Sequence, residues 1–230
     1  MKGIISGVSG LVDGTLIQQV RCDTISNNLA NLSTKGFKRD VLSFDEVLTQ
    51  KMHSAPDFSQ GPVQHTGNPF DLALDGQGFF KVQTPKGLRY TRDGALGLDK
   101  ENTLVNRNGH AILGDNGPIR IEGTEVSVGK DGQIQVDGVS VDRIIVVDFK
   151  DPRLLLKEGA NYYVNPGQAE EVPRPERTSL HQAYLEESNV DLTEEMIRMV
   201  EAFRAFEAMQ KGIQSIDEMT GKLINDPGLF

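Results

Sequence analysis

The chain has 230 residues, with 24 Lys and Arg against 33 Asp and Glu, which gives a formal net charge of −9. This acidity argues against a nucleic-acid-binding surface, so we expect no nucleic-acid partner. Four scattered histidines and one cysteine leave little for a metal site and exclude an internal disulfide.

No segment approaches the roughly 18 apolar residues that span a bilayer. At the N-terminus only Ile4 and Ile5 stand together before Ser6 and Gly7 interrupt them, so the apolar run of a cleavable signal peptide is missing. We therefore expect a soluble protein without direct membrane insertion and without a cleaved signal peptide.

The first predicted element is an N-terminal helix with a weak heptad stripe. Its residues follow steps of four and three, and they are Ile4, Val8, Leu11, Thr15, Gln18, Cys22, Ile25, Leu29 and Leu32. Glycines in and near the same segment, each costing about 1 kcal/mol relative to alanine, handicap an isolated helix. We expect this helix to fray when it stands alone.

The segment from Ser26 to Lys38 reads SNNLANLSTKGFK. Placing Gly36 just beyond the helix makes Leu32 and Phe37 the apolar pair of a Schellman-type ending. Asparagine is a mediocre helix former, so three of them suggest side-chain amides that bond another helix or subunit. These are Asn27, Asn28 and Asn31. The alternative is a solvated, fraying helix end.

The middle of the chain has a different pattern. Residues 41–69 show no sustained period and indicate a partly extended linker. From Phe70 to Phe149 short apolar segments alternate with turn dipeptides such as Asp75-Gly76 and Asn108-Gly109, which predicts an antiparallel β domain. The clearest hairpin lies around Asp131-Gly132. Residues 152–185 are ambiguous.

A second helix is predicted at the C-terminal end. Asp191 with Glu194 gives a capping start, and an apolar stripe follows through Leu192, Met196, Met199, Phe203, Phe206, Gln210 and Ile213. The first 39 residues are net basic and the last 45 are net acidic, which favours pairing of the two ends. An ordinary core-facing helix at each end is the alternative.

These patterns predict an α+β fold in which the N- and C-terminal helices pair as a coiled-coil-like unit and a central antiparallel β-rich domain lies between them. The expected divisions are a terminal helical domain (1–36 and 186–230), an extended linker (37–69) and a β-rich outer domain (70–185).

Motifs of enzymatic chemistry are missing from the sequence. The segment from Gly7 to Gly10 is one residue short of a nucleophile elbow and lies in a helix pattern. Gly76-Gln77-Gly78 lacks the third glycine of a dinucleotide loop, and a turn that enters a strand explains it. We expect no catalytic residues, no cofactor and no metal.

Three segments together resemble the bacterial flagellar rod and hook protein family. The first is Ser26-Asn27-Asn28-Leu29-Ala30-Asn31 with Thr34 and Gly36-Phe37-Lys38; the second is Asp71 to Thr84 with Tyr90 to Gly94; the third is Leu185 to Asp191 with Glu195-Met196 and Phe206-Glu207-Ala208. They occur in the family's order. The short chain and the segments at Gly117 and Asp131 favour a proximal rod protein, and a distal rod protein is the alternative.

The resemblance implies a structural subunit that polymerises into the coaxial rod of the flagellar basal body, spans the periplasm with its neighbours and transmits torque. It implies copies of itself and other proximal and distal rod proteins as partners. It also implies export by the flagellar type III apparatus, for which Phe44-x-x-x-Leu48 resembles the gate-recognition motif. An i,i+4 packing pair is the alternative for that motif.

Two other functions are weighed against this one. A secreted β-domain adhesin or binding module, dimerised by a simple coiled coil, would use the same helical ends. A small β-fold hydrolase would need a convergent set of His, Asp, Glu and Ser residues, which the sequence does not show.

Overall fold

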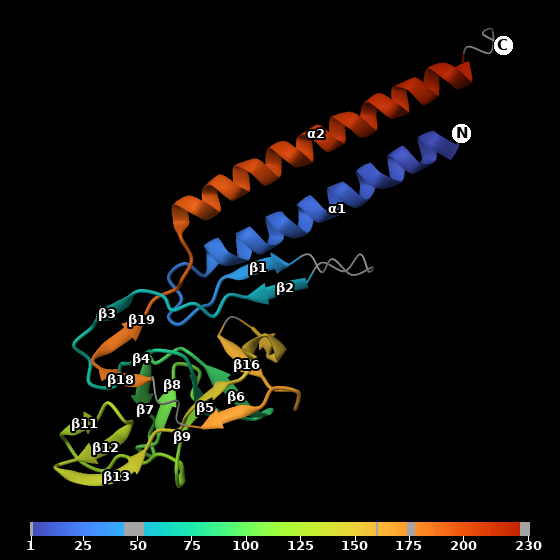
Figure 1. Ribbon diagram of the computed structural model, residues 1–230. Coiled ribbons are helices and arrows are strands. Elements are labelled where there is room, and N and C mark those ends of the chain that lie inside the picture. Colours follow the sequence, from blue (N-terminus) through green and yellow to red (C-terminus); the bar gives the residue numbers. More distant parts are fainter. Residues whose placement is uncertain (1, 44–52, 160, 174–177, 226–230) are drawn as a thin grey trace. The chain divides into compact units, whose positions relative to one another are not determined.

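The computed structural model describes residues 2–43, 53–159, 161–173 and 178–225. The chain forms two compact units, whose elements are shown in Figure 1. The helical unit comprises Met1–Ala30, Asp40–Ala55 and Asp191–Phe230, and the β unit comprises Asn31–Arg39 and Pro56–Val190. Each unit is therefore built from segments that lie far apart in the sequence.

The helical unit contains the helices α1 (Lys2–Ala30) and α2 (Leu192–Asn225) and a small sheet of β1 (Asp40–Ser43) and β2 (His53–Pro56). The carboxylate of Asp191 accepts a hydrogen bond from the amide of Glu194 at 3.0 Å and so caps the start of α2, as the sequence predicts. Neither helix, over the residues that the structure describes, combines the length and the apolarity needed to cross a membrane.

The expected pairing of the two helices as a coiled-coil-like unit through their heptad stripes is wrong. In α2 the stripe residues Leu192, Met196 and Phe203 are 48%, 56% and 53% exposed. The buried positions are Glu195 and Ala202, each one residue before a stripe residue. Part of the predicted stripe therefore faces outward, whereas an acid and a small residue are its best-buried neighbours. The α+β class itself is correct.

The two helices touch each other where glycines leave room. A Cβ added to Gly14 would lie 3.0 Å from the sulfur of Met209, and one added to Gly212 would lie 3.4 Å from Leu11. Gly14 lowers the intrinsic stability of α1, because glycine has a low helix propensity, but its missing Cβ leaves room for the Met209 side chain.

The end of α1 differs from the predicted Schellman-type ending. The helix ends at Ala30, and the amide of Phe37 donates to the carbonyl of Thr34 at 3.2 Å, within the turn that follows. Gly36 does adopt the left-handed conformation, with a φ of 66°, but its amide donates to the carbonyl of Glu186 at 2.8 Å. Gly36 therefore belongs to the packing of the β unit and does not terminate the helix.

The β unit consists of short strands and one 3₁₀ turn. These are β3 (Val63–His65), β4 (Leu72–Asp75), β5 (Phe79–Thr84), β6 (Gly87–Thr91), β7 (Leu96–Leu98), β8 (Leu104–Asn106), β9 (Ala111–Gly114), β10 (Gly117–Pro118), β11 (Val126–Val128), β12 (Gln133–Val136), β13 (Val139–Arg143), β14 (Val146–Phe149), η1 (Pro152–Leu154), β15 (Leu156–Glu158), β16 (Tyr162–Val164), β17 (Glu171–Pro173), β18 (Ser179–Gln182) and β19 (Tyr184–Glu186).

The strands pair in an antiparallel manner throughout the β unit. A 10-stranded sheet runs β15-β16-β6-β5-β9-β8-β7, with β10, β14 and β17 beside this path. The predicted hairpin around Asp131-Gly132 is confirmed, because Val126 pairs with Val136 and Val128 with Ile134. The ambiguous residues before 186 supply strands that return to early ones: β18 pairs with β4, and β19 pairs with β3.

The core of the β unit lies on both faces of the large sheet. Successive residues of β5 point to opposite faces. Phe79 joins an aromatic cluster with Tyr163, at 5.4 Å between ring centroids, whereas Phe80 joins the larger aliphatic cluster. In the described part of the chain, both clusters are built from residues of the β unit alone. The β unit therefore has a hydrophobic core of its own.

Gly36 gives a test of this packing. Substitution Gly36→Ala would place a Cβ 2.5 Å from the backbone of Arg92 at a φ of 66°. Backbone cannot move aside cheaply, so the close approach adds roughly 1–3 kcal/mol to the roughly 1 kcal/mol cost of a left-handed alanine. Urea unfolding of the full chain, followed through the β unit, measures the loss.

Gly109→Ala is the matched control, because Gly109 has a φ of 75° and nothing lies within 4 Å of the added Cβ. It should lose only the conformational part, about 1 kcal/mol. Equal losses in the two variants would show that the contact with Arg92 carries no energy.

Candidate assembly site

In the helical unit, the site centres on Asn28, which is 1% exposed. Its Nδ2 donates to the carbonyl of Asp40 at 3.0 Å, and its Oδ1 accepts from the amide of the same residue at 2.8 Å. Nδ2 also lies 3.3 Å from Oε2 of Glu195. One amide side chain thus holds α1, the start of β1 and the first turn of α2 together, which no apolar residue could do.

Glu195 is a buried carboxylate in this site, with 1% of its surface exposed. A buried charge is costly unless it is paired. Arg198 lies 3.3 Å from Oε1 of Glu195 and also bonds Glu194 at 2.5 Å. Asn27 donates to the carboxylate of Asp40 at 3.0 Å. The acidic groups of the site therefore accept hydrogen bonds from both helices, and Arg198 of α2 supplies the opposite charge.

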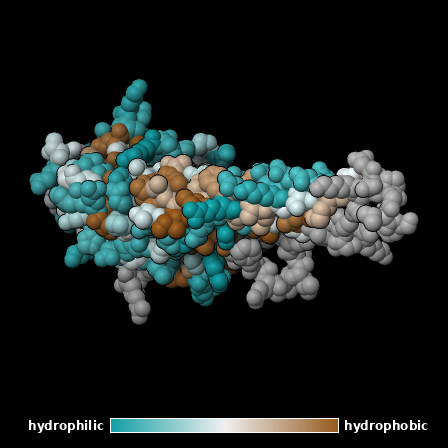
Figure 2. Space-filling view, turned by 90° about the horizontal axis from the view of Figure 1, so that it is seen from above, coloured by the Kyte–Doolittle hydropathy of each residue, from teal (hydrophilic) through white to brown (hydrophobic). Residues whose placement is uncertain are grey.

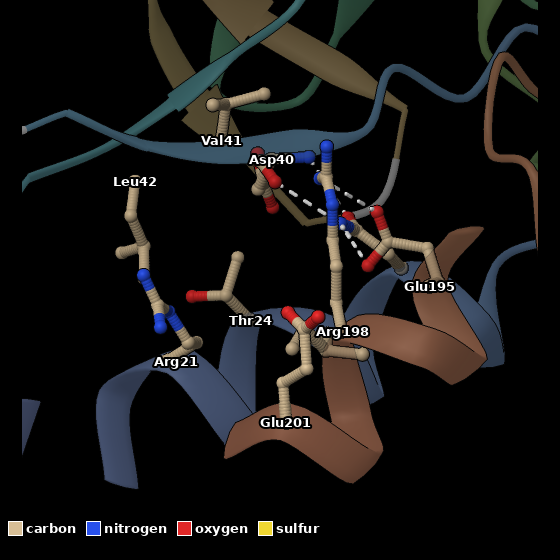
Figure 3. Close-up of a pocket in the computed structure, with 10 residues that line it drawn as sticks. Arg21, Thr24, Asp40, Val41, Leu42, Glu195, Arg198 and Glu201 are labelled. Carbon is tan, nitrogen blue, oxygen red and sulfur yellow. Dashed lines mark hydrogen bonds and ion pairs between the residues drawn. The ribbon is translucent and has the colours of Figure 1, made fainter. Parts of the chain in front are cut away.

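Beside Asn28 lies a cavity of about 320 Å³ in the helical unit (Figure 3). α1, β1 and α2 all contribute to its wall. The lining residues are Arg21, Thr24, Ile25, Asn28, Asp40, Val41, Leu42, Glu195, Arg198 and Glu201. The wall thus combines charges of both signs with apolar side chains, and Figure 3 shows Arg21 and Thr24 rising from α1 and Glu201 from α2.

In the β unit, the equivalent centre is a fully buried ion pair. Nζ of Lys38 lies 2.6 Å from Oε1 of Glu186, and both side chains are 0% exposed. Nζ also donates to the carbonyl of Ser59 at 2.6 Å. Burial lowers the pKa of the Lys38 ammonium, and the Glu186 carboxylate opposes that shift. The pair joins the segment after α1 to the segment before α2.

Glu186 serves further partners in the same core. Its Oε1 accepts from the amide of Gly61 at 2.9 Å, and Arg92 lies 3.5 Å from its other oxygen. Arg92 is 3% exposed and donates to the carbonyl of Gly76 at 2.6 Å. A single carboxylate therefore holds one backbone amide and two cations from three other parts of the β unit.

Asn189 closes the arrangement in the β unit. Its Oδ1 accepts from the amide of Arg39 at 2.7 Å, and its Nδ2 donates to the carbonyl of Asp57 at 2.9 Å. Burial alone would raise the pKa of Asp57, but hydrogen bonds from Ser59 and the contact with Arg39 outweigh it and lower the pKa. Asp57 stays ionised to bind Arg39.

The residues singled out from the sequence fall into several groups. In α1 and the following turn, Ile25, Asn28, Gly36 and Phe37 are buried, Leu11, Cys22, Leu29, Asn31 and Leu32 are half-buried, and Asn27 is exposed. In α2, Met199, Phe206 and Ile213 are half-buried, whereas Met196 and Phe203 are exposed. Ile4 and Val8 belong to α1. Phe44 and Leu48 lie outside the described residues, so their proposed export role stays a prediction.

Sequence reasoning misses the charged members of the site. In the sequence, Lys38, Glu186 and Glu195 look like parts of motifs or like surface charge, although each is almost wholly buried. No local pattern marks them, because Lys38 stands beside Arg39 and Glu195 stands beside Glu194. In the part of the chain that the structure describes, His, Cys, Asp and Glu form no group suited to a metal ion.

The comparisons with known proteins match the same segments. A flagella basal body rod protein family model matches residues 14–38, a model of the flagellar hook protein FlgE/F/G D1 domain matches 73–136, and a model of the flagellar basal body rod FlgEFG protein C-terminal matches 181–226. The flagellar basal-body rod protein FlgG of Bacillus subtilis is 31% identical over 98% of both chains. The flagellar basal-body rod protein FlgF of Caulobacter vibrioides is 34% identical over 90% of this chain and 91% of its own.

The chain therefore belongs to the flagellar basal-body rod protein family. Its relatives include FlgF as well as FlgG, so the resemblance to the rod family, with an FlgF-like member among the relatives, is confirmed. The matched segments contain the buried centres of the two units, Asn28, Lys38, Glu186 and Glu195, with Arg92 in the middle segment.

The buried ion pair gives the second testable prediction. Lys38→Met leaves Glu186 buried without its nearest cation, so the free energy of unfolding should fall by about 3–5 kcal/mol. Urea unfolding at neutral pH measures the change.

Lys86→Met is the matched control, since its Nζ lies 2.8 Å from Glu158 while the lysine side chain is 75% exposed. It should cost less than about 1 kcal/mol. A Lys38 variant as stable as the Lys86 variant would show that the buried pair does not hold the β unit together.

Proposed function

We propose that this chain is a structural subunit of the flagellar basal-body rod that assembles with copies of itself and with other rod proteins. Membership of the family supports this role. The observation that carries the proposal is that both helices of the helical unit leave large apolar side chains exposed, as a subunit with unfilled contacts would.

The exposed apolar residues form a stripe on each helix. On α1 they are Val12, Leu16 and Val20, which are 44%, 55% and 39% exposed. On α2 they are Leu192, Met196, Ile197, Val200 and Phe203, all close to half exposed. The surface drawn in Figure 2 shows such hydrophobic patches in brown among hydrophilic ones in teal. Neighbouring subunits would cover these stripes in the assembled rod.

A proximal position in the rod is our preferred reading, and a distal one is the alternative. The Caulobacter relative named FlgF supports the first, and the Bacillus relative named FlgG supports the second. Locating the subunit in a density map of isolated basal bodies decides between them.

Further parts of the proposal concern location and chemistry. We infer that the subunit reaches the rod, in the periplasm, through the flagellar type III export apparatus without a cleaved signal peptide. We also infer that it has no catalytic activity and needs no cofactor. The β unit would form the outer domain, because it carries its own hydrophobic core.

A binding module that forms a discrete dimer is the rival function. It would expose one self-complementary face and stop at two copies. Sedimentation over a range of concentrations separates a closed dimer from a monomer that forms open polymers.

Removal of residues 1–30 gives the third prediction. The truncated chain keeps Asn31–Arg39, which belong to the β unit, so this unit should remain folded. The chain should nevertheless fail to enter the rod, because α1 and its contacts at Asn28 are lost. Circular dichroism and urea unfolding report the fold, and motility of a strain carrying only the truncated gene reports assembly.

A second truncation, of residues 1–39, is the comparison. It also removes Phe37 and Lys38, both 0% exposed, and should unfold the β unit. Normal motility with residues 1–30 removed would refute the proposed role of the helical unit.

A further inference from the structure

The cavity of the helical unit carries charges that the chain itself does not use. Asn28, Asp40 and Glu195 at its wall are bonded to one another or to neighbours. Arg21 and Glu201 also line the cavity, and among the described residues neither takes part in an ion pair or a hydrogen bond. Arg21 is half-buried and Glu201 is exposed, so a partner can reach both.

The cavity continues the exposed apolar stripe of α1. Val12, Leu16, Val20 and Thr24 follow one another at intervals of four, so they share one face of the helix. The first three are exposed, and Thr24 lines the cavity together with Arg21. A helix laid along this stripe would therefore bring its own side chains to the mouth of the cavity.

The charge of Arg21 indicates which side chains such a helix would carry. It must present an acid to Arg21 and apolar side chains to Leu16 and Val20. The helix α2 of a second copy meets both requirements, because Glu201 stands beside Val200, which is 50% exposed. A second copy of this chain is therefore the occupant that the charges and the stripes favour.

We propose that α2 of one copy lies along α1 of the next copy, so that Glu201 of the first binds Arg21 of the second. Where this contact is made head to tail, each copy leaves one α1 and one α2 free for further copies, so an open helical polymer can grow; where the same pair forms twice about a two-fold axis, association stops at a dimer. This inference rests on the proposed function and adds the pair of residues that sets the contact.

The test reverses each charge in turn and measures the association between copies. Arg21→Glu and Glu201→Arg should each weaken self-association of the full chain, by roughly fivefold or more in the apparent association constant, because like charges then face each other. Neither side chain has a hydrogen-bond or ion-pair partner within the described part of the chain, so far-UV circular dichroism should show that both variants keep the two helices. Sedimentation velocity over a concentration series measures the association.

An equimolar mixture of the two single variants decides whether the pair forms between copies. When the two variants alternate, Glu201 of the Arg21→Glu variant faces Arg21 of the Glu201→Arg variant, and the two introduced residues face each other as acid and arginine. Every contact then joins opposite charges, so association should return to near the wild-type value. A pair formed inside one copy cannot be restored by mixing, and a mixture as weak as the single variants overturns the inference.

Glu207→Arg is the matched control, as Glu207 is exposed on α2 and does not line the cavity. It changes the net charge of the chain by the same amount as Glu201→Arg, so it measures the general effect of charge on association. An equal loss of association in this variant also overturns the inference.

The outcomes separate the inference from the function on which it rests. If the wild-type chain stays monomeric at every concentration, both the proposed self-assembly and the proposed contact are refuted. If the wild-type chain associates and neither charge reversal weakens that association, only the contact between Arg21 and Glu201 is refuted.

Discussion

The β unit depends on a buried ion pair between residues that are 148 positions apart in the chain. Lys38 and Glu186 are both 0% exposed, so neither could be buried without the other. Because the amide of Gly61 and the guanidinium of Arg92 share the same carboxylate, the segments before and after the strands must be present for the core to close. The segment after α1 and the segment before α2 are therefore both fixed within the β unit.

The helical unit is held in a different way. Among the described residues it contributes none to the two apolar clusters, and its best buried contacts are polar ones around Asn28 and Glu195. Hydrogen bonds fix geometry but add little net stability, whereas apolar burial supplies most of it. Large side chains such as Leu16 and Met196 remain in water. A unit built like this gains order chiefly when neighbours cover those side chains, which suits a subunit that folds fully on assembly.

The class of fold, the capped start of α2 and the hairpin at Asp131-Gly132 could be predicted from the sequence, because each depends on local chemistry that a few residues carry. The sheet partners of β18 and β19 could not, since pairing between distant strands leaves no local pattern. The sequence also identifies Gly36 as a residue with positive φ but places it in the wrong element. Its constraint is the backbone of Arg92, which no spacing reveals.

The apolar stripe predicted on α2 shows that helical periodicity does not always identify the buried face of a helix. The rule assumes that the largest apolar residues face the core of the same chain. Here an acid and an alanine, Glu195 and Ala202, face inward, and Met196 and Phe203 face outward. A chain that stayed alone would gain nothing from this inversion, because exposed apolar area only promotes association. Apolar side chains that face water without stabilising their own chain are expected where a second molecule covers them. Both helices of this subunit carry such side chains.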